Sequence, residues 1–130
     1  MKYRTRKLIK PEDLNGRNTL FGGRLMSWID EECAVYACCQ MKTSDIVTKY
    51  ISEMNFITPA FQGDVIEIGV ETAKIGDTSL TLTCIVRNKD SKQIIVKVDK
   101  VVFVAVDKAG KPKEYNKESL APPAIMEAAE

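Results

Sequence analysis

The feature that most restricts the fold of this chain is a stretch of 18 residues, Arg24 to Met41, with no glycine or proline and with 12 apolar positions. The apolar positions surround the helix axis almost completely. This pattern predicts a helix buried in the middle of the fold, because a surface helix would be polar on one side. The turn-forming residues Thr43, Ser44 and Asp45 predict its end.

The residues after this helix are strand-like in four segments separated by short breaks. Valine, isoleucine and leucine either alternate with polar residues there or follow one another, as in half-buried and buried strands. The segments are residues 46–57, 64–73, 79–87 and 93–106. The breaks are short enough for antiparallel connections. One buried helix followed by about four antiparallel strands predicts an α+β fold.

The two ends of the chain differ from this pattern. The first ten residues carry five basic residues and no acid, alternating with Tyr3, Thr5 and Ile9. They predict a charged strand at a sheet edge more than a basic binding arm. From Lys113 onward the chain is polar and then rich in alanine and proline. We therefore expect one domain over residues 1–112 and a polar, loosely ordered tail over residues 113–130.

The composition argues against several functional classes. The chain has no histidine, on which serine and cysteine triads and most zinc sites depend. Its 19 basic and 18 acidic residues argue against a nucleic-acid partner, and no apolar run is long enough to span a membrane. The cysteines lack CxxC spacing, so we expect small buried residues in a reducing cytoplasm, without a metal site or a disulfide framework. They are Cys33, Cys38, Cys39 and Cys84.

Three successive acids, Asp30, Glu31 and Glu32, interrupt the apolar helix. At about 100° per residue they cannot all face solvent if a sheet wraps the helix. Asp30 is the favoured functional candidate, because it lies on the same helix row as Met26, whereas the longer glutamates can reach water more easily. A solvated patch, or an ion pair with Arg24 or with a basic strand residue, is an equally open interpretation.

A second group of candidates precedes the helix. Residues 11–18 are rich in turn formers and predict a loop, in which Asn15 could form an Asx turn or orient a water molecule. Gly22 and Gly23 offer backbone N–H groups at the positive end of the helix dipole, where an oxygen that gains charge during acyl transfer can be stabilised. A tight turn that needs glycine is the simpler explanation of this pair.

These segments resemble the signature of a known family. Residues 11–15, 19–23 and 27–31 read PEDLN, TLFGG and SWIDE. They are similar to the P-x-D-x-N, T-x-F-G-G and S-x-I-D-E blocks of the hotdog-fold acyl-CoA thioesterases. Later blocks agree in order at residues 54–59, 63–64, 75–80, 103–107 and 110–112. The resemblance spans about residues 3–112, and several ordered blocks are more specific than one motif.

The resemblance implies a hotdog fold, in which a curved antiparallel β-sheet wraps one long central α-helix. In the family two such units pair into a dimer, which often assembles into tetramers or hexamers, and the active sites lie at the dimer interface. Asp30 matches the family's carboxylate, acting as general base on water or as nucleophile on the thioester. Asn15 matches a loop amide contributed by the opposite subunit, and Gly22 and Gly23 match the oxyanion donors.

The resemblance also implies an enzyme that hydrolyses acyl-CoA to a free carboxylic acid and CoA, with no metal or organic cofactor. A thiolate leaving group has a pKa of about 8.5 and needs little help from a general acid, so such a site can work without histidine. One alternative is a hotdog hydratase or dehydratase, which usually needs a histidine. Another is a non-catalytic acyl-CoA binding or sensing module, in which Asp30 and Asn15 would be relics.

Two parts of the chain depart from the family pattern. Residues 17–18 replace a His-Gly or Asn-Gly pair, so Gly16 is expected to supply the flexibility of the loop. Asp77 replaces a basic residue that precedes Thr78 and Ser79, the two residues expected to bind CoA; a plain hairpin explains this pair almost as well. The residues expected to supply positive charge instead are Lys49, Lys97 or Lys100.

Overall fold

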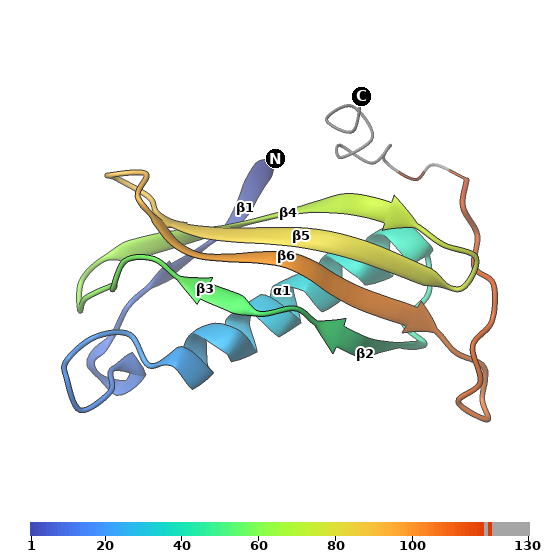
Figure 1. The fold of residues 1–130 in the computed structure, drawn as a ribbon, viewed down its shortest axis with the longest axis horizontal. Coiled ribbons are helices and arrows are strands. Elements are labelled where there is room, and N and C mark those ends of the chain that lie inside the picture. The colour runs from blue at the N-terminus through green and yellow to red at the C-terminus, as the bar shows by residue number, and fades with distance from the viewer. Residues whose placement is uncertain (119, 121–130) are drawn as a thin grey trace.

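The computed structural model describes residues 1–118 and 120. One long helix lies along one face of a six-stranded antiparallel sheet (Figure 1). The elements in chain order are β1 (Lys2–Leu8), the 3-10 helix η1 (Pro11–Asp13), α1 (Gly22–Met41), β2 (Ile46–Ile51), β3 (Met54–Phe56), β4 (Val65–Ile75), β5 (Ser79–Asn88) and β6 (Ile94–Ala105). The predicted α+β fold is confirmed.

The strand expected over residues 46–57 is divided into β2 and β3. Both pair with β6, β2 near its C-terminal end and β3 near its N-terminal end. Ser52 lies at the break, where its N–H donates to the carbonyl of Lys100 at 2.8 Å and its hydroxyl accepts from the N–H of Lys100 at 3.0 Å. The side chain thus replaces one step of the ladder, and the four strand segments expected after the helix form five strands.

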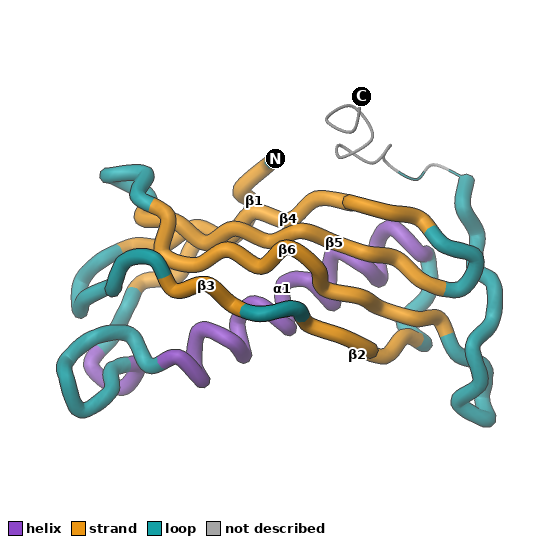
Figure 2. The backbone as a smooth tube through the Cα atoms, in the orientation of Figure 1, coloured by secondary structure: helices purple, strands orange, loops and turns teal. Residues whose placement is uncertain are grey.

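The strand order β1-β4-β5-β6-β2, with β3 also on β6, leaves two different edges (Figure 2). β1 forms one edge, as predicted, and its basic side chains discourage pairing with another chain. The β2–β3 edge is instead rich in exposed apolar side chains, a surface suited to pairing with another chain. These exposed residues are Val47, Tyr50, Phe56 and Ile57.

The sheet covers only one face of α1. The buried residues of the helix recur every four positions and pack on the inner face of the sheet, and they are Leu25, Ile29, Cys33, Ala37 and Met41. On the outer side, Met26 and Val35 are 47% and 55% exposed. The prediction of a helix buried all round is therefore wrong for a single chain, because no second layer covers the outer face. In the part of the chain that the structure describes, no helix has the length and apolarity of a membrane span.

The four cysteines are free, but they do not share one environment. Cys33 and Cys84 are buried as predicted, whereas Cys38 is half-buried and Cys39 is exposed. A hydrogen bond with Cys84, together with burial, raises the pKa of the Cys33 thiol. That thiol therefore stays protonated and is a poor nucleophile.

Residues 113–118 lie against the sheet instead of trailing from it. Tyr115 is 9% exposed, and its hydroxyl donates to the carbonyl of Ser79 at 2.7 Å. Lys117 Nζ donates to the carbonyl of Asp77 at 2.9 Å. This packing differs from the loosely ordered tail expected from residue 113, because the Tyr115 ring packs with the hydrophobic core. The rest of the expected tail, residue 119 and residues 121–130, lies outside the described residues.

Candidate active site

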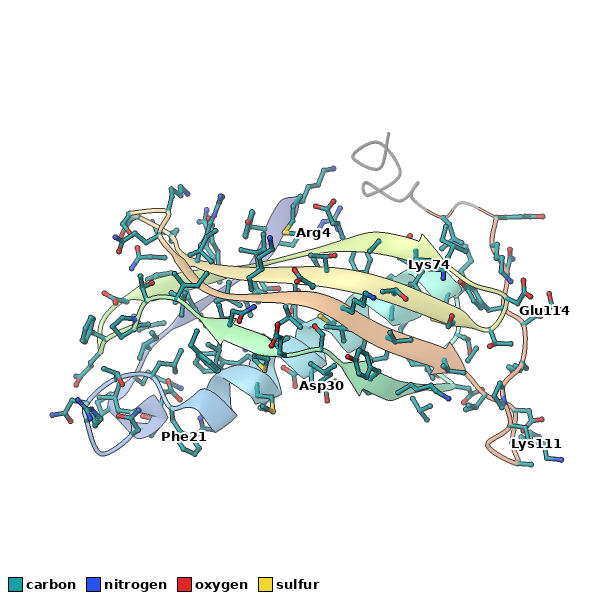
Figure 3. All side chains as sticks on the ribbon, viewed as in Figure 1. Arg4, Phe21, Asp30, Lys74, Lys111 and Glu114 are labelled. Atoms are coloured by element: carbon teal, nitrogen blue, oxygen red, sulfur yellow. The ribbon has the colours of Figure 1, made fainter. Side chains whose placement is uncertain are left out.

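Asp30 lies in the central part of α1, on the side that faces β2 (Figure 3). Its Oδ1 accepts a hydrogen bond from Thr48 Oγ1 at 3.0 Å. The carboxylate is half-buried, and Met26, one helical turn earlier, is exposed. Asp30 therefore lies where the open face of the helix meets the open edge of the sheet.

The two neighbouring acids point elsewhere. Glu31 is exposed, whereas a carboxylate oxygen of Glu32 accepts a hydrogen bond from the hydroxyl of Thr5 in β1. The three acids thus diverge around the helix, one toward each edge of the sheet and one into solvent. Helical geometry requires this divergence, since successive side chains are about 100° apart.

The loop before α1 is anchored by a buried carboxylate. Asp13 is 3% exposed and accepts a hydrogen bond from the N–H of Lys10 at 2.9 Å. Its other oxygen lies 3.2 Å from Nε of Arg24 in the first turn of α1. Arg24 therefore forms its ion pair with Asp13 and not with Asp30.

Asn15 organises the rest of this loop as an Asx turn. Its Oδ1 accepts from the N–H groups of Arg17 at 2.8 Å and of Thr19 at 3.2 Å, and its Nδ2 donates to Thr19 Oγ1 at 3.0 Å. A primary amide has two N–H donors, and Thr19 takes one of them. The left-handed residue of the loop is Asn18, with φ 61°, and not Gly16 as expected. Asparagine tolerates this conformation better than most residues.

Gly22 and Gly23 form the first turn of α1. Phe21 precedes them as the N-cap, and its side chain makes no capping hydrogen bond. Neither glycine has a positive φ, so conformational freedom does not explain the pair. A Cβ at Gly23 would lie 2.8 Å from Cε2 of Phe21, so any side chain would displace that ring. The glycines therefore leave space beside the first N–H groups of the helix.

An apolar cavity of about 240 Å³ lies beside this helix start. Its lining comes from residues 19–20, Leu25 of α1, residues 56–60 and Ile95 of β6. Leu25, Ala60 and Ile95 are at most 3% exposed, whereas Phe56 and Ile57 are more than half exposed. The cavity thus has a buried apolar floor and an open rim. Sequence reasoning missed it, because its walls come from segments far apart in the chain.

A polar groove of about 410 Å³ lies between β1, η1 and α1. Its cations already have partners: Arg24 pairs with Asp13, Lys10 with Glu12, and Lys7 lies 5.7 Å from the centre of the Trp28 ring. These contacts account for much of the positive charge of the groove, so it is a weak candidate for binding an anion.

Thr78 and Ser79 lie at the β4–β5 turn, at the opposite end of the sheet from the Asn15 loop (Figure 1). The carbonyl of Ser79 accepts from the N–H of Gly76 at 2.9 Å, which is ordinary hairpin chemistry. Lys117 reaches this turn through its contact with Asp77. Sequence reasoning missed Lys117, because the contact joins residues 40 positions apart.

A single chain does not bring all the candidate groups together. Asp30 lies seven positions after Gly23 in the helix, which is roughly 10 Å along the axis. In Figure 3, Phe21 at the helix start lies well away from Asp30. Reacting atoms must approach to about 3 to 3.5 Å, so one carbonyl cannot meet both groups of the same chain. Residues 1–118 and 120 contain no group of three or more acids, cysteines or histidines placed to hold a metal ion.

Comparison with known proteins gives a consistent result. The family model of the thioesterase superfamily matches residues 17–95. An acyl-CoA thioester hydrolase of Haemophilus influenzae, named as uncharacterised, is 32% identical over 123 residues, which are 87% of this chain and 79% of the relative. A similarly named protein of Bacillus subtilis, YkhA, is 31% identical over 107 residues, or 78% of this chain. The match spans 60% of the length of YkhA.

Among solved structures, the chain is similar to the hexameric thioesterase y2039 from Yersinia pestis. The TM-score is 0.80 at 30% sequence identity, and the match covers 88% of this chain and 95% of that chain. The likeness therefore extends over nearly the whole described fold.

Proposed function

The chain belongs to the thioesterase superfamily, and we propose that it hydrolyses acyl-CoA thioesters to a free carboxylic acid and CoA. The family and the hotdog fold expected from the sequence are confirmed. The observation that carries the proposal is the place of Asp30, a half-buried carboxylate where an open apolar helix face meets an open sheet edge.

We propose that two copies of the chain share each site. The distance between Asp30 and the glycines of its own helix supports this arrangement, since a second copy could bring its helix start to the carboxylate. Docking through the β2–β3 edge would also cover the exposed side chains of Met26 and Val35. The Yersinia relative is hexameric, and three such dimers would give this chain the same assembly.

In the proposed mechanism, Asp30 of one copy accepts a proton from water as the water oxygen attacks the thioester carbonyl carbon. The carbonyl oxygen gains negative charge and accepts hydrogen bonds from the N–H groups of Gly22 and Gly23 of the opposite copy. The second Nδ2 hydrogen of Asn15, from the opposite copy, holds the water or the carbonyl. The C–S bond then breaks, and the CoA thiolate takes a proton from Asp30. Direct attack by the Asp30 carboxylate is the second route, which would leave an acylated Asp30 in an acid-quenched single turnover.

For the CoA part of the substrate we propose contacts with Thr78 and Ser79. Lys117 lies at this turn, so we propose that it supplies positive charge there. From the sequence, this charge was expected from Lys49, Lys97 or Lys100. We propose that the reaction needs no metal or organic cofactor. The free cysteines suit a reducing cytoplasm as its location.

The test is release of free thiol from acyl-CoAs by the intact protein and by Asp30→Asn. Loss of a general base should lower kcat by about 10²- to 10⁴-fold. Glu31→Gln is the matched control, because that neighbour is exposed and its loss should leave kcat unchanged. Unchanged turnover in Asp30→Asn would reject the mechanism. Binding of acyl-CoA without any thiol release by the intact protein would favour the sensing module.

A further inference from the structure

We infer that Asp13 is a positioning residue for the proposed reaction, which holds the Asn15 loop at a fixed place relative to the first N–H groups of α1. This inference rests on the proposed thioester hydrolysis and concerns the half of the site that one copy supplies to the other. Asp13 itself is too deeply buried to touch the substrate, because only 4% of its side chain is exposed.

A short hairpin joins the two groups that are proposed to hold the thioester carbonyl. The N–H of Asn15 donates to the carbonyl of Thr19 at 2.8 Å. The N–H of Phe21 donates to the carbonyl of Asp13, also at 2.8 Å. The first arm of the hairpin thus carries Asn15, and the second arm leads directly into the glycine pair of α1. A shift of one arm against the other would separate the amide from the helix N–H groups.

The carboxylate of Asp13 adds a link that reaches past the hairpin into the helix. Its Oδ2 accepts from the N–H of Lys10 at 2.9 Å, and its Oδ1 lies 3.2 Å from Nε of Arg24. Arg24 directly follows Gly23 in the first turn of α1. The ion pair therefore fixes the helix start on the arm of the hairpin that also carries the loop amide.

The ion pair also neutralises a charge that would oppose the reaction. The Asp13 carboxylate lies beside the first turn of α1, and without a partner it would repel the carbonyl oxygen that gains negative charge during attack. Salt screens a buried charge much less than an exposed one. Arg24 therefore has two effects, since it ties the two segments together and cancels the charge of Asp13.

The experiment measures kcat and KM for thiol release by the intact protein and by Asp13→Asn. Asparagine keeps an oxygen for the N–H of Lys10 but carries no charge for Arg24. We expect kcat to fall by about 10- to 100-fold, as for reacting groups displaced by about 1 Å. KM should change little, because the hydrogen bonds concerned strengthen in the transition state.

Two further variants separate the charge from the position. Arg24→Gln should be the most damaging single change, because it leaves the buried carboxylate of Asp13 without a partner. The double variant Asp13→Asn with Arg24→Gln removes that carboxylate, so its kcat should exceed that of Arg24→Gln by about tenfold. If Asp13→Asn does not fold, the double variant takes its place, since it leaves no charge unpaired.

The matched control is Glu12→Gln. This neighbouring acid pairs with Lys10 on the surface, and 65% of its side chain is exposed. We expect Glu12→Gln to keep the native kcat and KM. Thermal unfolding of every variant shows that each kcat is measured on folded protein.

A second readout does not depend on activity. Labelling with ¹⁵N-glycine gives one backbone N–H signal in NMR for each of the seven glycines. The signals of Gly22 and Gly23 should move in the double variant and stay in place in Glu12→Gln. Because the double variant removes one charge of each sign, such a movement reports displacement of the helix start.

The outcomes separate the two proposals. If the intact protein releases thiol and folded Asp13→Asn keeps its full kcat, Asp13 serves only the structure and the inference is overturned. If the intact protein releases no thiol, the proposed hydrolysis is refuted and the NMR signals decide the inference. Unmoved signals of Gly22 and Gly23 in the double variant then overturn it, and moved signals support it.

Discussion

At the scale of single residues, we propose that Asn15 has two tasks, one in the loop and one at the substrate, which its two functional groups divide. The carbonyl oxygen of the side chain holds the loop by accepting from two backbone N–H groups, and the amino group has a second donor to offer. An alanine substitution removes both tasks together, so it cannot tell a loop anchor from a ligand for the substrate.

Asn15→Asp separates these tasks, because aspartate keeps the acceptor oxygens and loses the N–H donors. We expect Asn15→Asp to fold with nearly unchanged stability and to lower kcat by about 100-fold, as expected for a misplaced reacting group. Thiol release and thermal unfolding, measured on Asn15→Asp and Asn15→Ala together, check this prediction. Full activity in Asn15→Asp would show that the residue serves only the loop.

At the scale of secondary-structure elements, one buried carboxylate joins β1, β4 and β5. Glu67 in β4 is 2% exposed; its Oε1 accepts from Arg87 at 2.7 Å and from Lys92 at 3.2 Å, and Oε2 lies 3.6 Å from Arg6. Burial alone would raise the pKa of Glu67, but the hydrogen bonds and charges of Arg87 and Lys92 outweigh it, so its pKa lies below the ordinary value. The carboxylate is therefore most favourable in its ionised form.

This network predicts a loss of stability in acid. Because the folded pKa of Glu67 is lowered, its contribution is complete above the ordinary glutamate pKa of about 4.3 and is lost as the pH falls through the folded pKa. At neutral pH, Glu67→Gln should lower the free energy of unfolding by about 2 kcal/mol, the scale of hydrogen bonds to charged groups. Urea unfolding between neutral pH and pH values below the glutamate pKa measures both effects.

The control for this network is Asp90→Asn, since Asp90 pairs with Lys89 on the surface and its side chain is 79% exposed. Its effect should stay below about 0.5 kcal/mol. Equal losses in the two variants would show that the Glu67 network contributes no more than a surface ion pair.

At the scale of the whole molecule, the proposal that two copies share each site can be tested by mixing defective chains. In a hybrid dimer of Asp30→Asn with Asn15→Ala, one of the two sites has both residues intact. Random reassortment should therefore restore about one quarter of the native activity, since about half of the dimers are hybrids with one intact site each. Refolding the two variants together from urea, followed by a thiol-release assay, gives the measurement.

The separately refolded variants provide the baseline for this mixture. Activity no higher than the sum of the two parents would place Asp30 and Asn15 of one site on the same chain.

The sequence alone determined where the helix and most of the strands lie, and it singled out one acidic residue, Asp30, as a candidate for the site. The helix at residues 24–41 and the strands after it follow from apolar periodicity and from turn-forming residues, which act over a few positions. Asp30 could be favoured over Glu31 and Glu32 because its helix row and its shorter side chain are visible in the sequence, and the ordered blocks around it identified the family. The divergence of Asp30 from its acidic neighbours also follows from helical geometry.

Only the tertiary structure decided how these elements are covered and joined. It left one face of α1 open, brought Lys117 to the β4–β5 turn, divided the strand at Ser52 and formed a half-open cavity between α1, β3 and β6. Each of these features depends on contacts between residues far apart in the chain. Packing and long-range hydrogen bonds stabilise these contacts. No local pattern encodes such contacts, because a residue's partners across the sheet are set only when the register of every strand is fixed.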